Sequence, residues 1–149
     1  MANNDVASMA HLMRRAGFGA SYDELERRVS NGYEATVEEL LDPQAQPELQ
    51  MDLLLRHFVD WKQINGIETN QAHWTYRMIN TPRPLEEKIC LFWHGIFCVG
   101  DSKCQKPKQI QIQLDNFRAK GLGNFAILLL DLAKDPAMIY YLDNQLSHK

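Results

Sequence analysis

The sequence predicts an all-α protein, an irregular multi-helix bundle of about seven or eight helices. Three observations lead to this fold class. Apolar residues recur at three- and four-residue steps, which is the spacing of one helix face. Residues that cap or break helices separate these periodic segments. Alternating β-branched runs joined by hairpin turns do not occur in the sequence, so strands are not expected.

The first helix is expected to begin at Asp5, as its cap, and to run to about Ala16. Aspartate is a common cap because its side chain accepts hydrogen bonds from the free amides of the first turn. Gly17 and Gly19 follow and indicate a turn after this helix.

The second and third helices are predicted from a capping pattern and a proline. Ser21–Glu24 reads as a capping box, in which the serine hydroxyl accepts from the glutamate amide and the glutamate side chain reaches back. The helix that it starts should end near Gly32. A short third helix is expected over Ala35–Leu41, and Pro43 ends it because the residue before proline avoids helical geometry.

The middle of the chain contains the clearest amphipathic segment, Glu48–Ile64. Its apolar residues fall on one helix face: Met51, Leu54, Leu55, Phe58 and Trp61. Gly66 closes this segment. A fifth helix is predicted over about Asn70–Ile79, and the sequence "TPRP" at Thr81–Pro84 breaks the chain after it.

The next helix begins near Pro84, which is well placed in a first turn, and carries the unusual sequence "CLFWHGIFC" at Cys90–Cys98. Gly100 lies past its end. The remaining helices are expected at Pro107–Ala119, at Phe125–Ala133, and as a last turn or short helix from Asp135-Pro136 through Tyr141.

Length and charge exclude some classes of protein. A chain of 149 residues suits one core, so a single helical domain is expected over residues 1–149. The net charge of −3 argues against nucleic-acid binding, which needs clustered Lys and Arg against phosphates. The one basic cluster, Lys103, Lys106 and Lys108, includes a proline and is predicted to be a solvated loop.

Neither a membrane span nor a signal peptide is predicted. The apolar segment Phe125–Ala133 is far below the roughly 20 residues that a bilayer requires. The first ten residues, "MANNDVASMA", contain no apolar region of the kind found in signal peptides. Three cysteines cannot form a complete disulfide framework, so the residues alone favour a reduced, cytoplasmic protein.

The cysteines and His94 are the candidate metal ligands. Cys90, His94 and Cys98 lie at i, i+4 and i+8 of one predicted helix, and Cys104 follows in the next predicted loop. A helix rises about 1.5 Å per residue, which separates Cys90 from Cys98 by about 12 Å. Two sulfurs on one zinc ion lie at most about 4.6 Å apart. A site formed by His94, Cys98 and Cys104 is therefore the remaining metal hypothesis.

His94 has two other interpretations. As a general base it would need an orienting partner, and Glu87, two turns earlier, is too far away in a straight helix. As a core residue it would pack beside Trp93 and Phe97 and donate to a carbonyl, which is the interpretation that the residues favour. No dinucleotide-binding loop is predicted, because the paired glycines of "AGFGAS" and "KGLGNF" follow no predicted strand.

Four segments occur in order along the chain: "HLMRRAGFGAS", "RPLEEKICLFWHGIF", Gln113 with Arg118 and "GLGNF", and "LLLDLAKDPAMIYYLDN". Together they resemble one bacterial family, called domain of unknown function 1800. The resemblance implies a helical protein of uncharacterised activity. It also implies that full-length members are often exported and are often encoded near a second uncharacterised exported protein.

The chain departs from the family pattern in two ways. Family members are longer and continue into an Asn- and Glu-rich motif, so this chain is expected to be an N-terminal fragment without the family's leader. Family members also commonly carry a second histidine where this chain has Ile96. His94 is the only residue of that pair that the resemblance carries over, and the cysteines are not part of the family pattern.

Two functional hypotheses follow. In the first, the chain is a helical scaffold or interaction portion of a larger, exported protein. In this hypothesis the chain has no complete active site and leaves apolar surface uncovered near its C-terminal end. This surface is expected to bind a second copy of the chain, the missing C-terminal region or the second exported protein. In the second, the chain is part of a metal-dependent enzyme, and His94 contributes to a site that the missing region completes.

Overall fold

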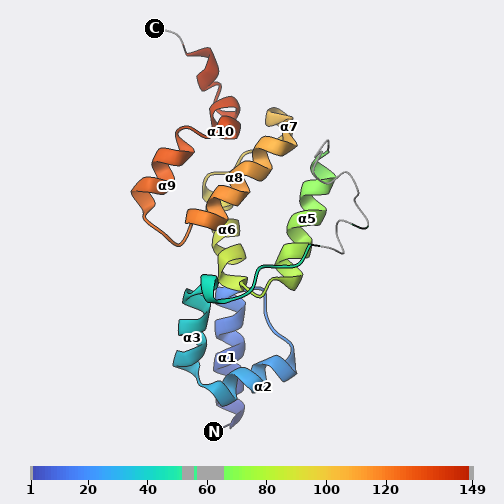
Figure 1. Cartoon of the computed structure of the whole chain (residues 1–149), viewed down its shortest axis with the longest axis vertical. Coiled ribbons are helices and arrows are strands. Elements are labelled where there is room, and N and C mark those ends of the chain that lie inside the picture. The colour runs from blue at the N-terminus through green and yellow to red at the C-terminus, as the bar shows by residue number, and fades with distance from the viewer. Residues whose placement is uncertain (1, 52–55, 57–65, 148–149) are drawn as a thin grey trace. The chain divides into compact units, whose positions relative to one another are not determined.

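The computed structural model describes residues 2–51, 56 and 66–147, and all regular structure in this part of the chain is helical (Figure 1). The helices are α1 (Ala2–Ala16), α2 (Tyr22–Asn31), α3 (Tyr33–Leu41), α5 (Ile67–Asn80), α6 (Pro84–Ile96), α7 (Asp101–Cys104), α8 (Pro107–Lys120), α9 (Phe125–Leu132) and α10 (Pro136–Tyr141), with 3-10 turns η1 (Pro43–Ala45) and η2 (Asn144–Leu146). The predicted all-α class is confirmed. The amphipathic segment predicted at Glu48–Ile64 lies mostly outside the described residues.

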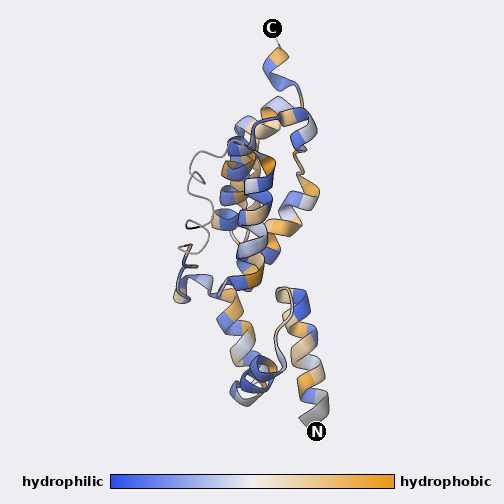
Figure 2. Ribbon diagram, turned by 90° about the vertical axis from the view of Figure 1, so that its right-hand side faces the viewer, coloured by the Kyte–Doolittle hydropathy of each residue, from blue (hydrophilic) through white to orange (hydrophobic). Residues whose placement is uncertain are grey.

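The chain divides into two compact units, and each is described by itself. Unit 1 comprises Met1–Leu49 and Arg77–Lys88, and unit 2 comprises Gln50–Tyr76 and Ile89–Lys149. The single domain expected over residues 1–149 stays a prediction. Apolar and hydrophilic residues alternate along the helices of both units, as amphipathic helices require (Figure 2).

Unit 1 packs α1, α2 and α3 around a small apolar core. Its buried apolar residues are Met9, Met13, Ala16, Leu25 and Leu40. The turn after α1 depends on its two glycines. Gly19 has φ of 101°, a conformation that other residues rarely adopt. A Cβ on Gly17 would lie 2.9 Å from the Cβ of Pro84, so this glycine permits a close approach to the start of α6.

Two details of unit 1 differ from prediction. Helix α1 begins at Ala2, so Asp5 lies in its first turn rather than at its cap, because no residue between Ala2 and Asp5 stops a helix. Half of the predicted capping box forms, since the Ser21 hydroxyl accepts from the Glu24 amide at 3.3 Å. The Glu24 carboxylate accepts instead from the Arg28 guanidinium at 2.9 Å, and Arg28 also donates to Glu39 of α3 at 3.3 Å.

Unit 2 has the larger apolar core, to which α6, α8, α9 and α10 contribute. Its buried members are Cys90, Val99, Cys104, Ile110, Leu114, Phe117, Leu128 and Ala137. At the end of α8, Gly121 allows the chain to pass close to Trp93, whose indole N–H donates to the Gly121 carbonyl at 2.9 Å. A Cβ at this glycine would lie 2.8 Å from the Trp93 ring.

The boundaries in unit 2 are set by caps and prolines. Asn124 caps α9 by accepting from two backbone amides, and Asp135 caps α10, which has proline at its first position. Helix α6 ends at Ile96, earlier than predicted, so Cys98 lies outside it. The predicted loop after Gly100 contains instead the short helix α7, in which the Cys104 amide donates to the Gly100 carbonyl at 3.0 Å.

The predicted basic loop is accordingly only partly a loop. Lys103 lies in α7 and Lys108 in the first turn of α8, and Lys106 alone lies between helices. All three side chains belong to exposed residues, so the cluster is solvated, as predicted.

Candidate functional site

A pocket of about 280 Å³ lies in unit 2 and includes His94 in its wall. Its polar lining residues are Asn70 and Gln71 from α5, His94 from α6 and Asp101, the first residue of α7. Its apolar lining residues are Ile67, Trp74, Val99, Ile110 and Leu114. The pocket therefore has an apolar wall and a small number of polar groups, which is the composition typical of small-molecule sites.

Asn70 is nearly fully buried, and its orientation is set by one hydrogen bond. Its side-chain Nδ2 donates to the Pro107 carbonyl at 2.7 Å. An amide oxygen in that position would face another oxygen, so the bond determines which end of the amide is which. The Asn70 Oδ1 is then a buried acceptor that has no hydrogen-bond partner among the described residues.

His94 lies against the aromatic ring of Trp74 in an edge-to-face arrangement. The two ring centroids are 5.2 Å apart and the ring planes are inclined at 84°. Burial lowers the pKa of His94 from its ordinary value of 6.5, because the charged imidazolium loses contact with water. The ring is therefore neutral at neutral pH. Its Nδ1 is buried and, within the described ranges, has no hydrogen-bond partner. His94 thus faces a pocket with other polar groups rather than a closed aliphatic core.

Asp101 supplies the negative charge of the pocket. Its Oδ1 is buried without a hydrogen-bond partner in the part of the chain that the structure describes. Its charge also acts on the neighbouring Cys104, whose pKa is raised first by burial and further by the carboxylates of Asp101 and Asp135. The Cys104 thiol is consequently protonated at neutral pH.

None of the three cysteines forms a disulfide in the described structure, and their surroundings differ. Cys90 and Cys104 are fully buried core residues, and the Cys90 thiol donates to the Leu114 carbonyl at 3.4 Å. Cys98 is exposed. Among residues 2–51, 56 and 66–147, no group of three or more His, Cys, Asp or Glu side chains is placed to hold a metal ion. The structure does not assemble His94, Cys98 and Cys104 into a metal site, and that assignment stays a prediction.

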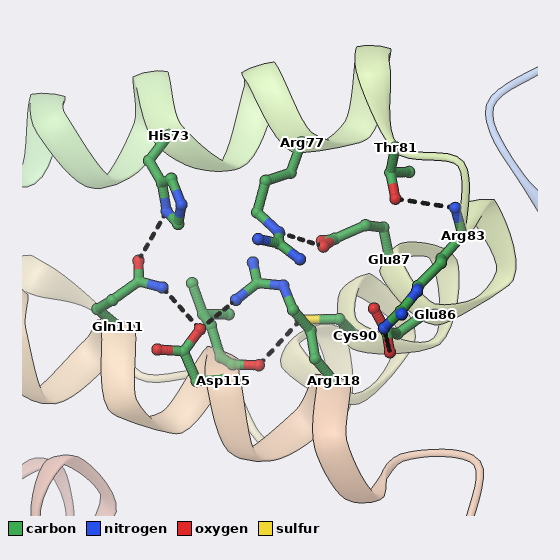
Figure 3. Close-up of polar contacts among 11 residues, drawn as sticks. His73, Arg77, Thr81, Arg83, Glu86, Glu87, Cys90, Gln111, Asp115 and Arg118 are labelled. Carbon is green, nitrogen blue, oxygen red and sulfur yellow. Dashed lines mark hydrogen bonds and ion pairs between the residues drawn. The ribbon is translucent and has the colours of Figure 1, made fainter. Parts of the chain in front are cut away.

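A second polar cluster in unit 2, partly buried, has a different character, because its groups bind one another (Figure 3). His73 of α5 and Gln111 of α8 point toward each other, with Nδ1 and Oε1 3.4 Å apart. Gln111 donates to Asp115 at 3.0 Å, and Arg118 donates to the same carboxylate oxygen at 2.6 Å. These bonds join α5 to α8 and hold α8 internally, so we assign this cluster to structure.

Helix α9 presents a second notable feature, an exposed apolar surface. Leu128 points into the core, but most other apolar side chains of the helix are exposed to solvent: Phe125 by 52%, Ile127 by 54%, Leu129 by 38% and Leu130 by 62%. Phe92 of α6 is also exposed, and both Phe92 and Phe125 contact the Trp93 ring. We call these five exposed residues, Phe92, Phe125, Ile127, Leu129 and Leu130, the α9 surface.

Of the pocket's polar groups, sequence reasoning identified only His94. Asn70 was expected at the start of a helix and Asp101 in a loop, and neither was singled out as a ligand-binding residue. The local sequence indicates that Asp101 begins a helix, since an acidic residue directly after glycine is typical of a helix start. Nothing local indicates that Asn70 lines the same pocket as Asp101, because the contact between α5 and the start of α8 that orients Asn70 is tertiary.

Comparison with known proteins shows which family the chain matches. The model of a family described as "Protein of unknown function (DUF1800)" matches residues 11–149, which is most of the chain. No curated protein and no solved structure matches the chain. Within the described part of the chain, no helix combines the length and the apolar character needed to cross a membrane.

Proposed function

We propose, for a chain that belongs to the DUF1800 family of proteins of unknown function, a role as a helical scaffold that binds another protein surface through the α9 surface. The observation that carries this proposal is the exposure of four apolar side chains on a helix of eight residues. Contiguous exposed apolar surface on a folded protein typically marks a site of association.

The geometry of α9 spreads these side chains over one broad face. Successive residues of a helix are about 100° apart around its axis. Phe125, Leu129, Leu130 and Ile127 therefore follow one another over about 200° of the helix circumference, with the small Ala126 among them. Leu128 is directed away from this range and is 2% exposed, which fixes the buried side of the helix.

The α9 surface is held in place by three contacts with its surroundings. The Asn124 side chain accepts from the amides of Ala126 and Ile127 at 2.9 and 3.2 Å. Phe125 stacks on Trp93 with ring centroids 5.5 Å apart. Lys120 pairs with Asp131 near the end of the helix. A prearranged surface loses little conformational entropy on binding.

The partner that fits this surface best is a second copy of the chain. Asp131, the one charged residue within α9, is already paired with Lys120, so two copies of the surface can meet without burying an unpaired charge from this helix. The net charge of −3 is too small to keep two copies apart. In a two-fold dimer the same apolar residues would come from both copies.

Analytical ultracentrifugation of the whole chain tests this proposal. We expect an association that increases with protein concentration and that is lost in the double variant Ile127→Glu, Leu130→Glu. The matched control is Leu41→Glu, Ile79→Glu, which places the same charges at exposed apolar positions of unit 1. A wild-type chain that stays monomeric at all concentrations, or a control that dissociates as readily as the α9 variant, would contradict the proposal.

The alternative hypothesis, part of a metal-dependent enzyme, has less support. Its candidate ligands His94, Cys98 and Cys104 are not grouped as a metal site among the described residues. A contact with a C-terminal region of the kind expected in longer family members, a contact with a second exported protein, and the export of full-length members stay predictions from the family resemblance. Mass spectrometry of proteins crosslinked to the α9 surface would identify such partners.

A further inference from the structure

We propose that the pocket around His94 binds a small organic cation, a primary ammonium group carried on a compact apolar body. This inference does not depend on the α9 surface. It rests on three buried polar atoms that lack hydrogen-bond partners in the described structure, and on the fact that all three residues line one pocket. Two of these atoms are the acceptor oxygens Asn70 Oδ1 and Asp101 Oδ1, and the third is the ring nitrogen His94 Nδ1.

The number and kind of these atoms match an ammonium group. Leaving a buried acceptor without a hydrogen bond costs free energy, so three such atoms in the residues lining one pocket favour the binding of a molecule that supplies donors. A primary ammonium group has three N–H donors and no acceptor. Neutral His94 accepts at Nδ1 when its proton is on Nε2, and Asn70 has its oxygen fixed as an acceptor by the bond from its Nδ2 to Pro107.

The charge of the pocket also selects a cation. Asp101 is acidic, and none of the pocket's described lining residues is lysine or arginine. An anion would meet a carboxylate and two further acceptors. A neutral alcohol would offer one donor to three acceptors. A cation gains a charge-assisted hydrogen bond to Asp101, which is stronger than a bond between neutral groups.

The size and apolar wall of the pocket favour an organic ligand over a bare metal ion. A volume of about 280 Å³ is close to the lower limit for small-molecule sites. The wall contributed by Trp74, Val99 and Leu114 offers no metal ligand but would bury an apolar ligand body. The edge-to-face contact of Trp74 with His94 holds the imidazole in place beside this wall.

Isothermal titration calorimetry with three matched probes tests the proposal on the whole chain. Benzylamine, benzyl alcohol and benzoate have the same ring and carry a positive, a neutral and a negative group. We expect benzylamine to bind with a dissociation constant on the order of 1 mM, as for a fragment-sized ligand, and the other two at least about tenfold more weakly. Equal binding of benzylamine and benzyl alcohol, or no binding of benzylamine, would overturn the proposal.

Two variants connect the binding to the pocket. Asp101→Asn removes the charge with little change in shape, and we expect it to weaken benzylamine at least about tenfold without changing the binding of benzyl alcohol. Glu68→Gln is the matched control, because Glu68 is an exposed carboxylate on the same helix as Asn70 and does not line the pocket. Equal loss of benzylamine affinity in both variants would place the binding elsewhere.

A measurement that needs no variant keeps the proposal testable if Asp101→Asn does not fold. A ligand that binds only the folded chain raises its melting temperature. Benzylamine should raise the melting temperature of the wild-type chain, whereas benzyl alcohol and benzoate at the same concentration should not. A parallel titration with zinc chloride tests the metal alternative. The assignment to an organic cation would be overturned if zinc bound stoichiometrically, if this binding were lost in His94→Gln, and if benzylamine did not change the melting temperature.

Discussion

Units 1 and 2 both bury polar side chains, but they satisfy them differently. In unit 1 the three buried charged residues Arg28, Glu86 and Glu87 each have an ion-pair partner. No described residue of unit 1 has a buried side-chain polar atom without a hydrogen bond. In unit 2, buried acceptors of Asn70 and Asp101 lack such partners in the described structure. Buried charges in unit 1 are therefore satisfied by ion pairs, whereas unit 2 also contains buried polar atoms without partners among the described residues.

Volume alone would not have identified the pocket. A larger hollow of about 610 Å³ lies in unit 1, but its polar lining residues Asp5, Ser8 and His11 are all exposed to solvent. Conversely, Gln113 and Asp135 of unit 2 also have buried oxygens without partners, but the cavity that they line measures only about 10 Å³. The His94 pocket is distinguished because it combines room for a ligand with unpartnered buried groups.

The largest effect is expected from the apolar core of unit 2. If the fold of this unit rests on its core rather than on the polar groups of the pocket, Phe117→Ala should lower the free energy of unfolding by about 4 kcal/mol, because it removes a fully buried ring and leaves a cavity. Urea denaturation measures this change. Met13→Ala makes the equivalent change in unit 1 and should cost about 3 kcal/mol. A loss below about 1 kcal/mol for Phe117→Ala would show that the core is not what holds unit 2.

The next largest effect should come from the ion pair of Arg77 and Glu87, whose atoms are 2.6 Å apart in unit 1 (Figure 3). The Glu87 side chain is 0% exposed. Glu87→Ala should lower the free energy of unfolding by about 3 kcal/mol, since breaking a buried pair leaves a charge uncompensated. Chemical denaturation gives the value, and it tests whether the paired charges of unit 1 are structural.

The exposed ion pair of Lys103 and Asp143 in unit 2 provides the control for burial. Its atoms are also 2.6 Å apart, but its side chains are 45% and 53% exposed. Lys103→Ala should therefore cost less than about 1 kcal/mol. If the two variants lost similar amounts of stability, burial would not explain the difference between the pairs.

Helix limits in this protein follow from local chemistry, whereas the pocket does not. Pro107, Phe125 and Pro136 begin their helices as predicted, because prolines and capping residues act within one turn. The predicted end of α6 was too late, because the apolar sequence continues past Ile96 although the helix does not. The segment after Gly100 was predicted as a loop because its lysines and proline obscured the start of α7.

The contacts that build the pocket are between residues distant in sequence. Periodicity identified His94 as unusual, but its neighbour Trp74 comes from another helix. The orientation of Asn70 depends on the carbonyl of Pro107, the first residue of α8. Such contacts depend on how helices pack, and a single sequence contains no local signal for them.

A smaller effect is expected at Asp135, the cap of α10. Its Oδ1 accepts from the Met138 amide at 2.8 Å and from the Gln113 side chain at 3.0 Å. Asp135→Ala should cost about 1.5 kcal/mol, as for the loss of a cap. Asp135→Asn retains an accepting oxygen and should cost less than half of that. Thermal unfolding compares the two. Equal losses would mean that the negative charge of Asp135, and not its capping bond, stabilises this end of unit 2.

The smallest effect is a pH dependence that His94 confers on the stability of unit 2. Burial lowers the pKa of His94 in the folded chain below its ordinary value of 6.5. The unfolded chain therefore binds a proton more readily than the folded chain. The stability associated with neutral His94 is present above pH 6.5 and is lost as the pH falls through the lower, folded-state pKa.

His94→Gln removes this titration and isolates its contribution from that of the carboxylates. We expect the free energy of unfolding of the wild-type chain to fall more than that of His94→Gln when the pH is lowered from about 7 to about 5. His11→Gln, at an exposed position of unit 1, should follow the wild type. Bound benzylamine should hold His94 in its neutral form by donating to Nδ1, so it should lower the folded-state pKa of His94 further and extend the wild-type loss of stability to lower pH. If the three chains lost stability in parallel, His94 would not be the buried, neutral acceptor on which the difference between the two units depends.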